Sequence, residues 1–210
     1  MIDESTGGPR VAVVYYSSTG TVAGLARAVA EGVREAGGTV VLRRVAESAP
    51  DEAVASNEAW AAHRAADADV PVVEVADLLA ADAVVLGTPT RFGNVSSQLK
   101  GFLDTLGGPW SRGELADKVY SVFVASDTAH GGQESTLLAL YQTIHHFGGV
   151  LVAPGYTDAA KFADGNPYGT GHVTDNGPLG ETSLEAARVQ GRRVARFARA
   201  VAAVTPARAA

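Results

Sequence analysis

The sequence predicts an α/β domain built on a five-stranded parallel sheet with helices on both faces. Two observations lead to this fold class. Short β-type apolar runs alternate five times with segments whose apolar residues recur at helical spacing. Several of the runs are continuous, which is typical of parallel strands that are buried on both faces. Ligands of such sheets bind beyond the carboxyl ends of the strands, so the loops at that edge are the most informative part of the chain.

The first half of the chain begins with a strand whose six residues, VAVVYY, are all apolar or aromatic. A helix with an apolar face follows, and Gly37 and Gly38 end it. The next strand leads into an Ala-rich segment, which we interpret as a long connection carrying some helix, with Trp60 as a packing residue. The expected bounds are strands at 11–16 and 39–45, a helix at 21–36 and the connection at 46–76.

The second half of the chain repeats the strand and helix alternation three times. Two long segments rich in Gly and Pro, around Trp110 and after the fifth strand, are expected to be loops. The expected bounds are strands at 83–86, 119–125 and 150–153, helices at 96–106, 135–147 and 183–204, and loops at 87–95, 107–115 and 154–182.

These elements are expected to form one domain of residues 10–204, with a mobile polar tail at 1–9 and a short tail at 205–210. The chain has 210 residues and no cysteine, which excludes disulfides, thiolate metal sites and thiol nucleophiles, and no metal site is expected. Redox chemistry would therefore need an external cofactor. The formal net charge of −6 argues against nucleic acid as a partner. With neither a signal peptide pattern nor a long apolar run, the expected location is the cytoplasm, without a membrane span.

The loop after the first strand, SSTGT from Ser17 to Thr21, gathers hydroxyls and backbone N–H groups at a helix N-terminus. Such a site binds anions, and phosphate is its natural ligand, although the same residues could form an ordinary helix cap. The motifs GxxxxGK[ST] and GxGxxG are absent here, which argues against nucleotide hydrolysis and the usual dinucleotide fold.

Two more polar loops follow the third and fourth strands. TPTRFGN, from Thr88 to Asn94, offers an aromatic ring, a cation, hydroxyls and a carboxamide, which suit a planar heterocycle as well as a structural loop. SDTAHGGQ starts at Ser126 and lies at the same sheet edge. His145 and His146 end the following helix, where a histidine is often only a favourable partner of the helix dipole.

In this order, YYSSTGTV, GTPTRFGNVSSQLKGFLDTLGGPW, HGGQESTL and NPYGTGHV resemble the WrbA-type NAD(P)H:quinone oxidoreductases of the flavodoxin superfamily. The likeness covers the chain from about Val11 to Ala200, and its most specific part is GTPTRFGN followed by GGPW. It implies a flavodoxin-like fold and a two-electron reduction of quinones that depends on flavin mononucleotide (FMN), with NADH or NADPH as the donor. It also implies a homotetramer in which each flavin lies near residues of neighbouring subunits, so the expected assembly is a homotetramer or a homodimer.

The resemblance also implies roles for individual residues. His146 matches a family histidine that touches the flavin, and with His130 it is a candidate proton donor. Trp110 matches the tryptophan that walls the nicotinamide and quinone pocket, and Thr19 is a second substrate-contacting position. The residues expected to bind FMN are Ser17, Ser18, Thr19, Gly20, Thr21, Val22, Pro89, Thr90, Arg91, Phe92, Gly93, Asn94, Val95, Ala125, Ser126, Asp127, Thr128, Ala129, His130, Gly131 and His146.

The chain departs from the family pattern at two places. Thr19 stands where some members carry a tyrosine that contacts the nicotinamide nucleotide, and Asp127 and His130 lie where some members have a glycine-rich run. Two rival functions stay open at this point, an electron-carrier flavodoxin and a non-enzymatic partner-binding protein. A receiver domain of the response-regulator type is disfavoured, because the first strand ends in serines and threonines and not in acids.

Overall fold

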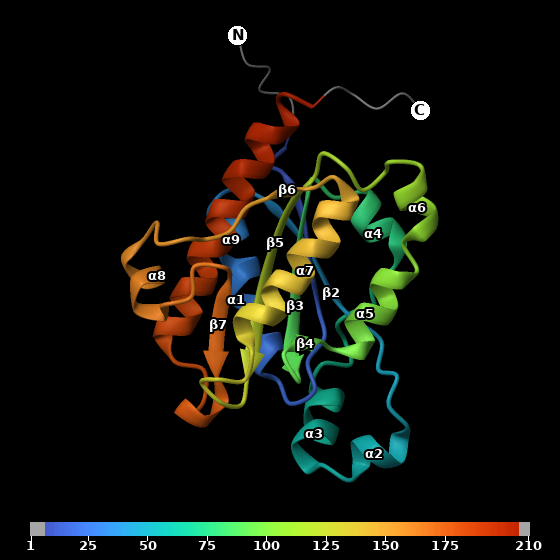
Figure 1. The fold of residues 1–210 in the computed structure, drawn as a ribbon, viewed down its shortest axis with the longest axis vertical. Helices are drawn as coiled ribbons and strands as arrows, with labels where there is room; N and C mark the ends of the chain where they lie inside the picture. Colours follow the sequence, from blue (N-terminus) through green and yellow to red (C-terminus); the bar gives the residue numbers. More distant parts are fainter. Residues whose placement is uncertain (1–6, 206–210) are drawn as a thin grey trace.

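The computed structural model describes residues 7–205, so most of each expected tail lies outside the described residues. The centre of the fold is a parallel sheet in the strand order β2-β1-β3-β5-β6 (Figure 1). Its strands are β1 (Arg10–Tyr15), β2 (Thr39–Arg44), β3 (Ala83–Arg91), β5 (Val119–Ser126) and β6 (Val150–Leu151). The strand order reverses between β1 and β3, which places a ligand site at their carboxyl ends.

Helices cover both faces of the sheet, as the sequence predicted (Figure 1). On one face lie α1 (Thr21–Glu35) and α9 (Glu181–Ala202). The two helices pack so closely at Gly191 that a Cβ added there would lie 2.1 Å from the Val29 carbonyl oxygen. On the other face lie α4 (Val75–Leu79), α5 (Ser97–Asp104) and α7 (Gln133–Phe147). Alternate residues of each central strand enter the two cores, because successive side chains of a strand point to opposite faces.

The last strand position of the sheet is filled by two separate segments. β6 pairs with the start of β5, and β7 (Thr170–Val173) pairs with its end, from Phe123 to Ser126. The chain between them carries α8 (Ala159–Asp164), and η1 (Thr174–Asn176) follows β7. The expectation of one long loop at 154–182 was therefore wrong. Each of these elements is too short to give a recognisable period in the sequence.

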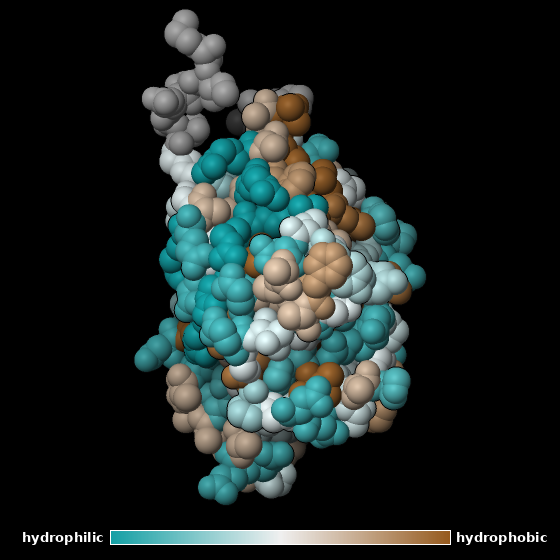
Figure 2. Space-filling model, turned by 90° about the vertical axis from the view of Figure 1, so that its left-hand side faces the viewer, coloured by the Kyte–Doolittle hydropathy of each residue, from teal (hydrophilic) through white to brown (hydrophobic). Residues whose placement is uncertain are grey.

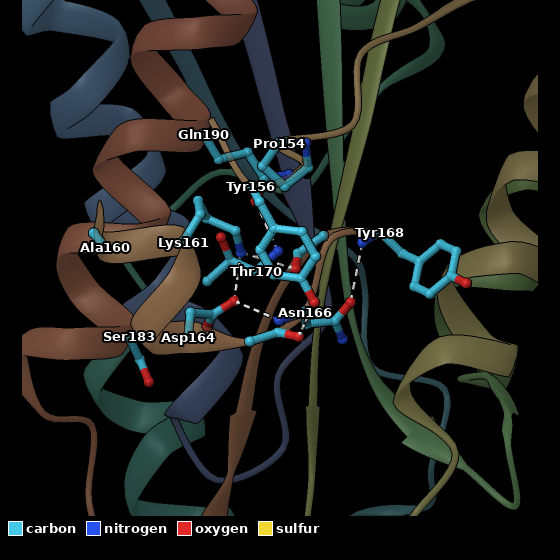
Figure 3. A network of polar contacts seen from close by, with 12 residues as sticks. Pro154, Tyr156, Ala160, Lys161, Asp164, Asn166, Tyr168, Thr170, Ser183 and Gln190 are labelled. Atoms are coloured by element: carbon cyan, nitrogen blue, oxygen red, sulfur yellow. Dashed lines mark hydrogen bonds and ion pairs between the residues drawn. The ribbon is translucent and has the colours of Figure 1, made fainter. Parts of the chain in front are cut away.

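We call the segment between β6 and β7, residues 152–169, the insertion. A buried ion pair holds it together (Figure 3). Lys161 and Asp164 on α8 are an ion pair with fully buried side chains, and the Lys161 ammonium group also donates to the Gly169 carbonyl oxygen at 3.2 Å. Burial lowers the pKa of Lys161 and raises the pKa of Asp164. Nearby, the side-chain carbonyl oxygen of Gln190 on α9 accepts a hydrogen bond from the Thr170 backbone N–H at 3.0 Å, which ties the insertion to the helical layer.

The outer surface of the insertion carries two stacked aromatic rings, Tyr156 and Phe162, with centroids 5.1 Å apart. Both side chains are exposed. Figure 2 shows this side of the molecule as a mostly hydrophilic surface with separate hydrophobic areas.

Three further short helices complete the fold. The connection at 46–76 contains α2 (Asp51–Ala55) and α3 (Glu58–Ala66), which lie beyond the carboxyl edge of the sheet (Figure 1). The segment around Trp110 forms α6 (Gly107–Ser111), where a loop was expected. The helical turn follows directly on α5, and Pro109 occupies its first turn, where the missing N–H of proline costs nothing.

Candidate functional site

The loop between β1 and α1 exposes the N-terminus of a 15-residue helix. Gly20 precedes the helix with a φ of 103°, a left-handed conformation that glycine adopts without strain. No side chain caps the helix, and its first turn holds no acidic residue. The Ser17 hydroxyl oxygen accepts a hydrogen bond from the Gly20 N–H at 3.1 Å, which holds the turn. The free N–H groups and the helix dipole make this end of α1 suitable for a phosphate.

The second loop is a β-hairpin and not the irregular loop expected at 87–95. β3 continues to Arg91, and the chain returns antiparallel as β4 (Asn94–Val95). Phe92 and Gly93, at its tip, both have positive φ, 53° and 75°, as a tight two-residue hairpin turn requires. The β-branched threonines at 88 and 90 favour the strand extension.

This hairpin carries a cation to the first loop. The Arg91 guanidinium donates a hydrogen bond to the Ser18 hydroxyl oxygen at 3.1 Å. The first loop itself has no lysine or arginine, so Arg91 supplies the positive charge beside it. At the tip of the hairpin, Phe92 is fully exposed to solvent.

The third loop, between β5 and α7, is held from two sides. Buried Gln133 donates hydrogen bonds from its amide nitrogen to the Ser126 hydroxyl oxygen (2.8 Å) and the His172 carbonyl oxygen (2.9 Å). Asp127 accepts from the Thr174 hydroxyl at 3.0 Å, and its carbonyl oxygen accepts from the Asp175 N–H. The end of β7 is therefore fastened to the third loop.

The three loops surround one open pocket of about 320 Å³ at the carboxyl edge of the sheet. Most of the residues expected to bind FMN line it, and Thr19 lies exposed at its rim. The expected residues among its lining are Ser17, Ser18, Thr19, Thr21, Val22, Pro89, Thr90, Arg91, Phe92, Ala125, Ser126, Asp127, Thr128 and Gly131. The structure adds Thr174, which the sequence reasoning missed because the strand that leads to it was not recognised.

Other expected site residues are near the pocket without lining it. Gly20 and Gly93 shape the turns of the first two loops, and Asn94 donates to the Phe92 carbonyl oxygen at 3.1 Å across the hairpin. Val95 pairs with Thr90 in the hairpin ladder, and exposed Ala129 and His130 belong to the third loop.

Trp110 and His146 lie together far from this pocket. The Trp110 indole N–H donates to the His146 carbonyl oxygen at 2.7 Å, and both residues are exposed. His146 is 13 positions beyond Gln133, at the other end of α7, which corresponds to a distance of about 20 Å along the helix. Figure 1 shows α6, which carries Trp110, at the sheet edge opposite to β4. Within one chain, these two residues do not reach the pocket.

Two kinds of feature are missing from residues 7–205. These residues contain no helix that is long and apolar enough to cross a membrane. They also contain no group of three or more His, Asp or Glu side chains placed to hold a metal ion.

The comparison with known proteins decides the family. A model described as NADPH-dependent FMN reductase matches residues 9–164, which include all three pocket loops. The chain belongs to this family. Curated relatives of this FMN reductase family member cover nearly its whole length. One from Deinococcus radiodurans, named NAD(P)H dehydrogenase (quinone), is 45% identical over 185 residues, which are 88% of this chain and 92% of the relative. One of the same name from Paracoccus denitrificans is 42% identical over 203 residues, covering 92% and 95% of the two chains.

Solved structures place this member among flavodoxin-like proteins. The crystal structure of a WrbA-like flavodoxin from Agrobacterium tumefaciens aligns with a TM-score of 0.66 at 29% identity, covering 91% of this chain and 98% of the other. An archaeal flavodoxin aligns with a TM-score of 0.60 at 13% identity, covering 90% and 99% of the two chains, a likeness of fold. The expected flavodoxin-like fold and the resemblance to WrbA-type proteins are confirmed.

Proposed function

We propose that this protein is an NAD(P)H:quinone oxidoreductase that binds FMN in the pocket at the carboxyl edge of its sheet. The observation that carries the proposal is the convergence of three loops on one pocket, with a helix N-terminus on one side and an exposed aromatic hairpin tip on the other. Relatives named for NAD(P)H dehydrogenase activity on quinones, which match about nine tenths of the chain, support the reaction.

The donor set of the pocket fits FMN. The N-terminal N–H groups of α1 and the hydroxyls of Ser17, Ser18 and Thr21 suit the phosphate, and Arg91 adds a cation beside them. The hairpin and the third loop line the rest of the pocket with Thr90 and Ser126, whose hydroxyls donate to the Gly131 and Thr128 carbonyl oxygens and so hold the wall beside the ring system in place. Bound there, FMN would accept a hydride from the nicotinamide and deliver two electrons to the quinone.

The residues of this chain would bind and orient the reactants. NAD(P)H and the quinone would use the same open side of the pocket in turn, giving ping-pong kinetics. Reduction of a quinone by a hydride also consumes one proton from outside the donor. His130 in the third loop, His146 and solvent are the candidate sources, since an imidazole ring can carry and donate a proton.

The position of Trp110 and His146 supports an oligomeric site. These residues lie at the sheet edge opposite to the pocket of their own chain, so they would serve the pocket of a neighbouring copy. In a homodimer or homotetramer, Trp110 would wall the space above the flavin where nicotinamide and quinone stack.

The test is NADH oxidation by benzoquinone on the purified protein, with and without added FMN, together with FMN titration followed by flavin fluorescence. Saturable turnover that depends on FMN is the expected result. FMN binding without NADH turnover would instead identify an electron carrier. Failure to bind FMN at all would overturn the proposal and favour a partner-binding role.

A further inference from the structure

One carboxylate outside the pocket is hydrogen bonded to residues at the base of two of its loops. Glu47 follows β2 in the connection at 46–76, and it accepts three side-chain hydrogen bonds. Its Oε2 accepts from the Tyr16 hydroxyl at 2.8 Å and from the Trp60 indole N–H at 3.1 Å. Its Oε1 accepts from the Gln98 amide at 2.8 Å. The backbone N–H groups of the next two residues, 48 and 49, also donate to Oε1, each at 2.9 Å.

The donors come from three separate parts of the fold. Tyr16 directly precedes Ser17, the first residue of the first loop. We call this loop the phosphate loop, because it is proposed to bind the phosphate of FMN. Gln98 lies in the first turn of α5, directly after the β3–β4 hairpin. Trp60 lies on α3, which lies beyond the same sheet edge (Figure 1). Glu47 therefore connects the beginning of the first loop to the end of the second.

The ionised carboxylate satisfies all five donors. Both of its oxygens accept, whereas the amide nitrogen of a glutamine in place of Oε2 would face the Trp60 indole N–H, which can only donate. Burial by itself would raise the pKa of Glu47, but hydrogen bonds from the Ala49 N–H, Gln98 and Tyr16 outweigh it and lower the pKa. Burial and the hydrogen bond to Glu47 raise the pKa of Tyr16, which keeps the hydroxyl a donor. Charge-assisted hydrogen bonds of this kind are about twice as strong as neutral ones.

The hydrogen bonds of Glu47 link the two loops that meet where the phosphate is proposed to bind. Arg91 of the hairpin donates to Ser18 of the first loop. That contact depends on how the two loops lie relative to each other, and Glu47 joins the two loop ends through Tyr16 and Gln98. Glu47 does not line the pocket, so it acts through its partners.

We propose that Glu47 is a positioning residue for phosphate recognition, and that its carboxylate holds the phosphate loop and the Arg91 hairpin in their binding arrangement. The inference rests on the proposed function, because it assumes that FMN is the ligand of this pocket. It assigns a role to the connection at 46–76, from which the sequence suggested none.

The test compares the dissociation constants of FMN and riboflavin for wild type, Glu47→Gln and the control Glu58→Gln, measured by flavin fluorescence. The two ligands differ by the phosphate, so their ratio reports phosphate recognition alone. We expect Glu47→Gln to weaken FMN binding about tenfold, which corresponds to about 1.4 kcal/mol, and to weaken riboflavin much less. Glu58→Gln removes the same charge from an exposed position on α3 and should behave as wild type.

Two further variants keep the proposal testable if Glu47→Gln does not fold. Tyr16→Phe removes only the hydrogen bond to the first loop, and Trp60→Phe removes only the one to α3. We expect Tyr16→Phe to lower the FMN preference over riboflavin and Trp60→Phe to leave it unchanged. Urea unfolding of each variant measures any general loss of stability separately.

The outcomes separate the inference from the proposed function. If wild type prefers FMN and the preference persists in Glu47→Gln, or in Tyr16→Phe should the first variant not fold, Glu47 has only a structural role and the inference is wrong. If wild type binds FMN no better than riboflavin, the pocket does not recognise a phosphate, and the FMN site itself has to be abandoned.

Discussion

Gly132, between the third loop and α7, is a residue whose identity is fixed by two constraints. Its φ is 88°, and a Cβ at this position would lie 2.6 Å from the Cα of Gly93 in the hairpin. The hairpin and the third loop can approach each other this closely only because residue 132 is a glycine. The Ser135 hydroxyl then donates to the Gly93 carbonyl oxygen at 2.8 Å. This contact joins two walls of the pocket.

We expect Gly132→Ala to lower the free energy of unfolding by about 1–3 kcal/mol, the usual cost of a strained backbone position, and to weaken FMN binding. Urea denaturation and FMN titration would measure both effects. Gly101→Ala is the matched control, because Gly101 lies on α5 with no atom within 4 Å of the added Cβ. That change should stabilise the protein by about 0.5–1 kcal/mol, the helix preference of alanine over glycine. Equal effects of the two substitutions would contradict this account.

The buried Lys161–Asp164 pair gives a second prediction at this scale. We expect Lys161→Met to destabilise the protein by about 3–5 kcal/mol, because it leaves the Asp164 carboxylate buried without its partner. Lys100→Met breaks an exposed pair with Asp104 and should cost less than about 1 kcal/mol. Thermal or urea unfolding distinguishes the two, and a similar small loss in both would show that Asp164 becomes neutral or hydrated at little cost.

The pocket loops could be predicted from the sequence because each is a short local motif next to a strong strand or helix signal. Thr174 and Glu47 could not, since their partners are distant in the chain. The Thr174–Asp127 hydrogen bond spans 47 residues, and the Glu47–Gln98 hydrogen bond spans 51. Neither residue carries a local pattern, so only the folded chain brings them to the site.

At the scale of elements, the stability of α3 depends more on the capping of its N-terminus than on the burial of its side chains. None of its residues is fully buried, although it carries Trp60 to the Glu47 carboxylate. The Asn57 side-chain oxygen caps the helix by accepting from the Trp60 N–H at 3.1 Å. The sequence predicted some helix in this connection but not its bounds, because its many alanines give no apolar face.

We expect Asn57→Ala to destabilise α3 by about 1 kcal/mol, the usual value of an N-cap. Trp60 emission, measured in a Trp110→Phe background that leaves it the sole tryptophan, should shift toward that of a solvated indole at lower urea than global unfolding. Coincident transitions in wild type and variant would show instead that α3 unfolds only with the whole domain.

At the scale of the whole molecule, the sheet separates the two groups of proposed site residues. The pocket lies at the carboxyl edge, whereas Trp110 and His146 lie at the opposite edge. The sequence could place both groups on loops and helix ends, but the distance between them follows from the length of α7. Only an assembly of copies can combine the two surfaces.

Assembly therefore predicts that activity depends on concentration. We expect turnover per chain to fall when the protein is diluted below the concentration at which light scattering detects dissociation. His146→Ala and Trp110→Ala should reduce quinone turnover without changing the size of the assembly. Constant turnover per chain through dissociation would mean that each pocket is complete within one chain.

The divided last strand has a consequence for how this protein can vary. β6 and β7 lie on the same side of β5, β6 beside its start and β7 beside its end. The chain therefore leaves the sheet after β6 and rejoins it at β7, and each of the two segments keeps its own register with β5. The length of the segment between them can thus change with both strand pairings kept, provided that the new segment fills the place where Lys161 and Asp164 are buried. Its downstream end delivers Thr174 to the rim of the pocket. Substrate preference could in this way diverge through one exchangeable segment, while the two loops that meet at the end of α1 stay as they are.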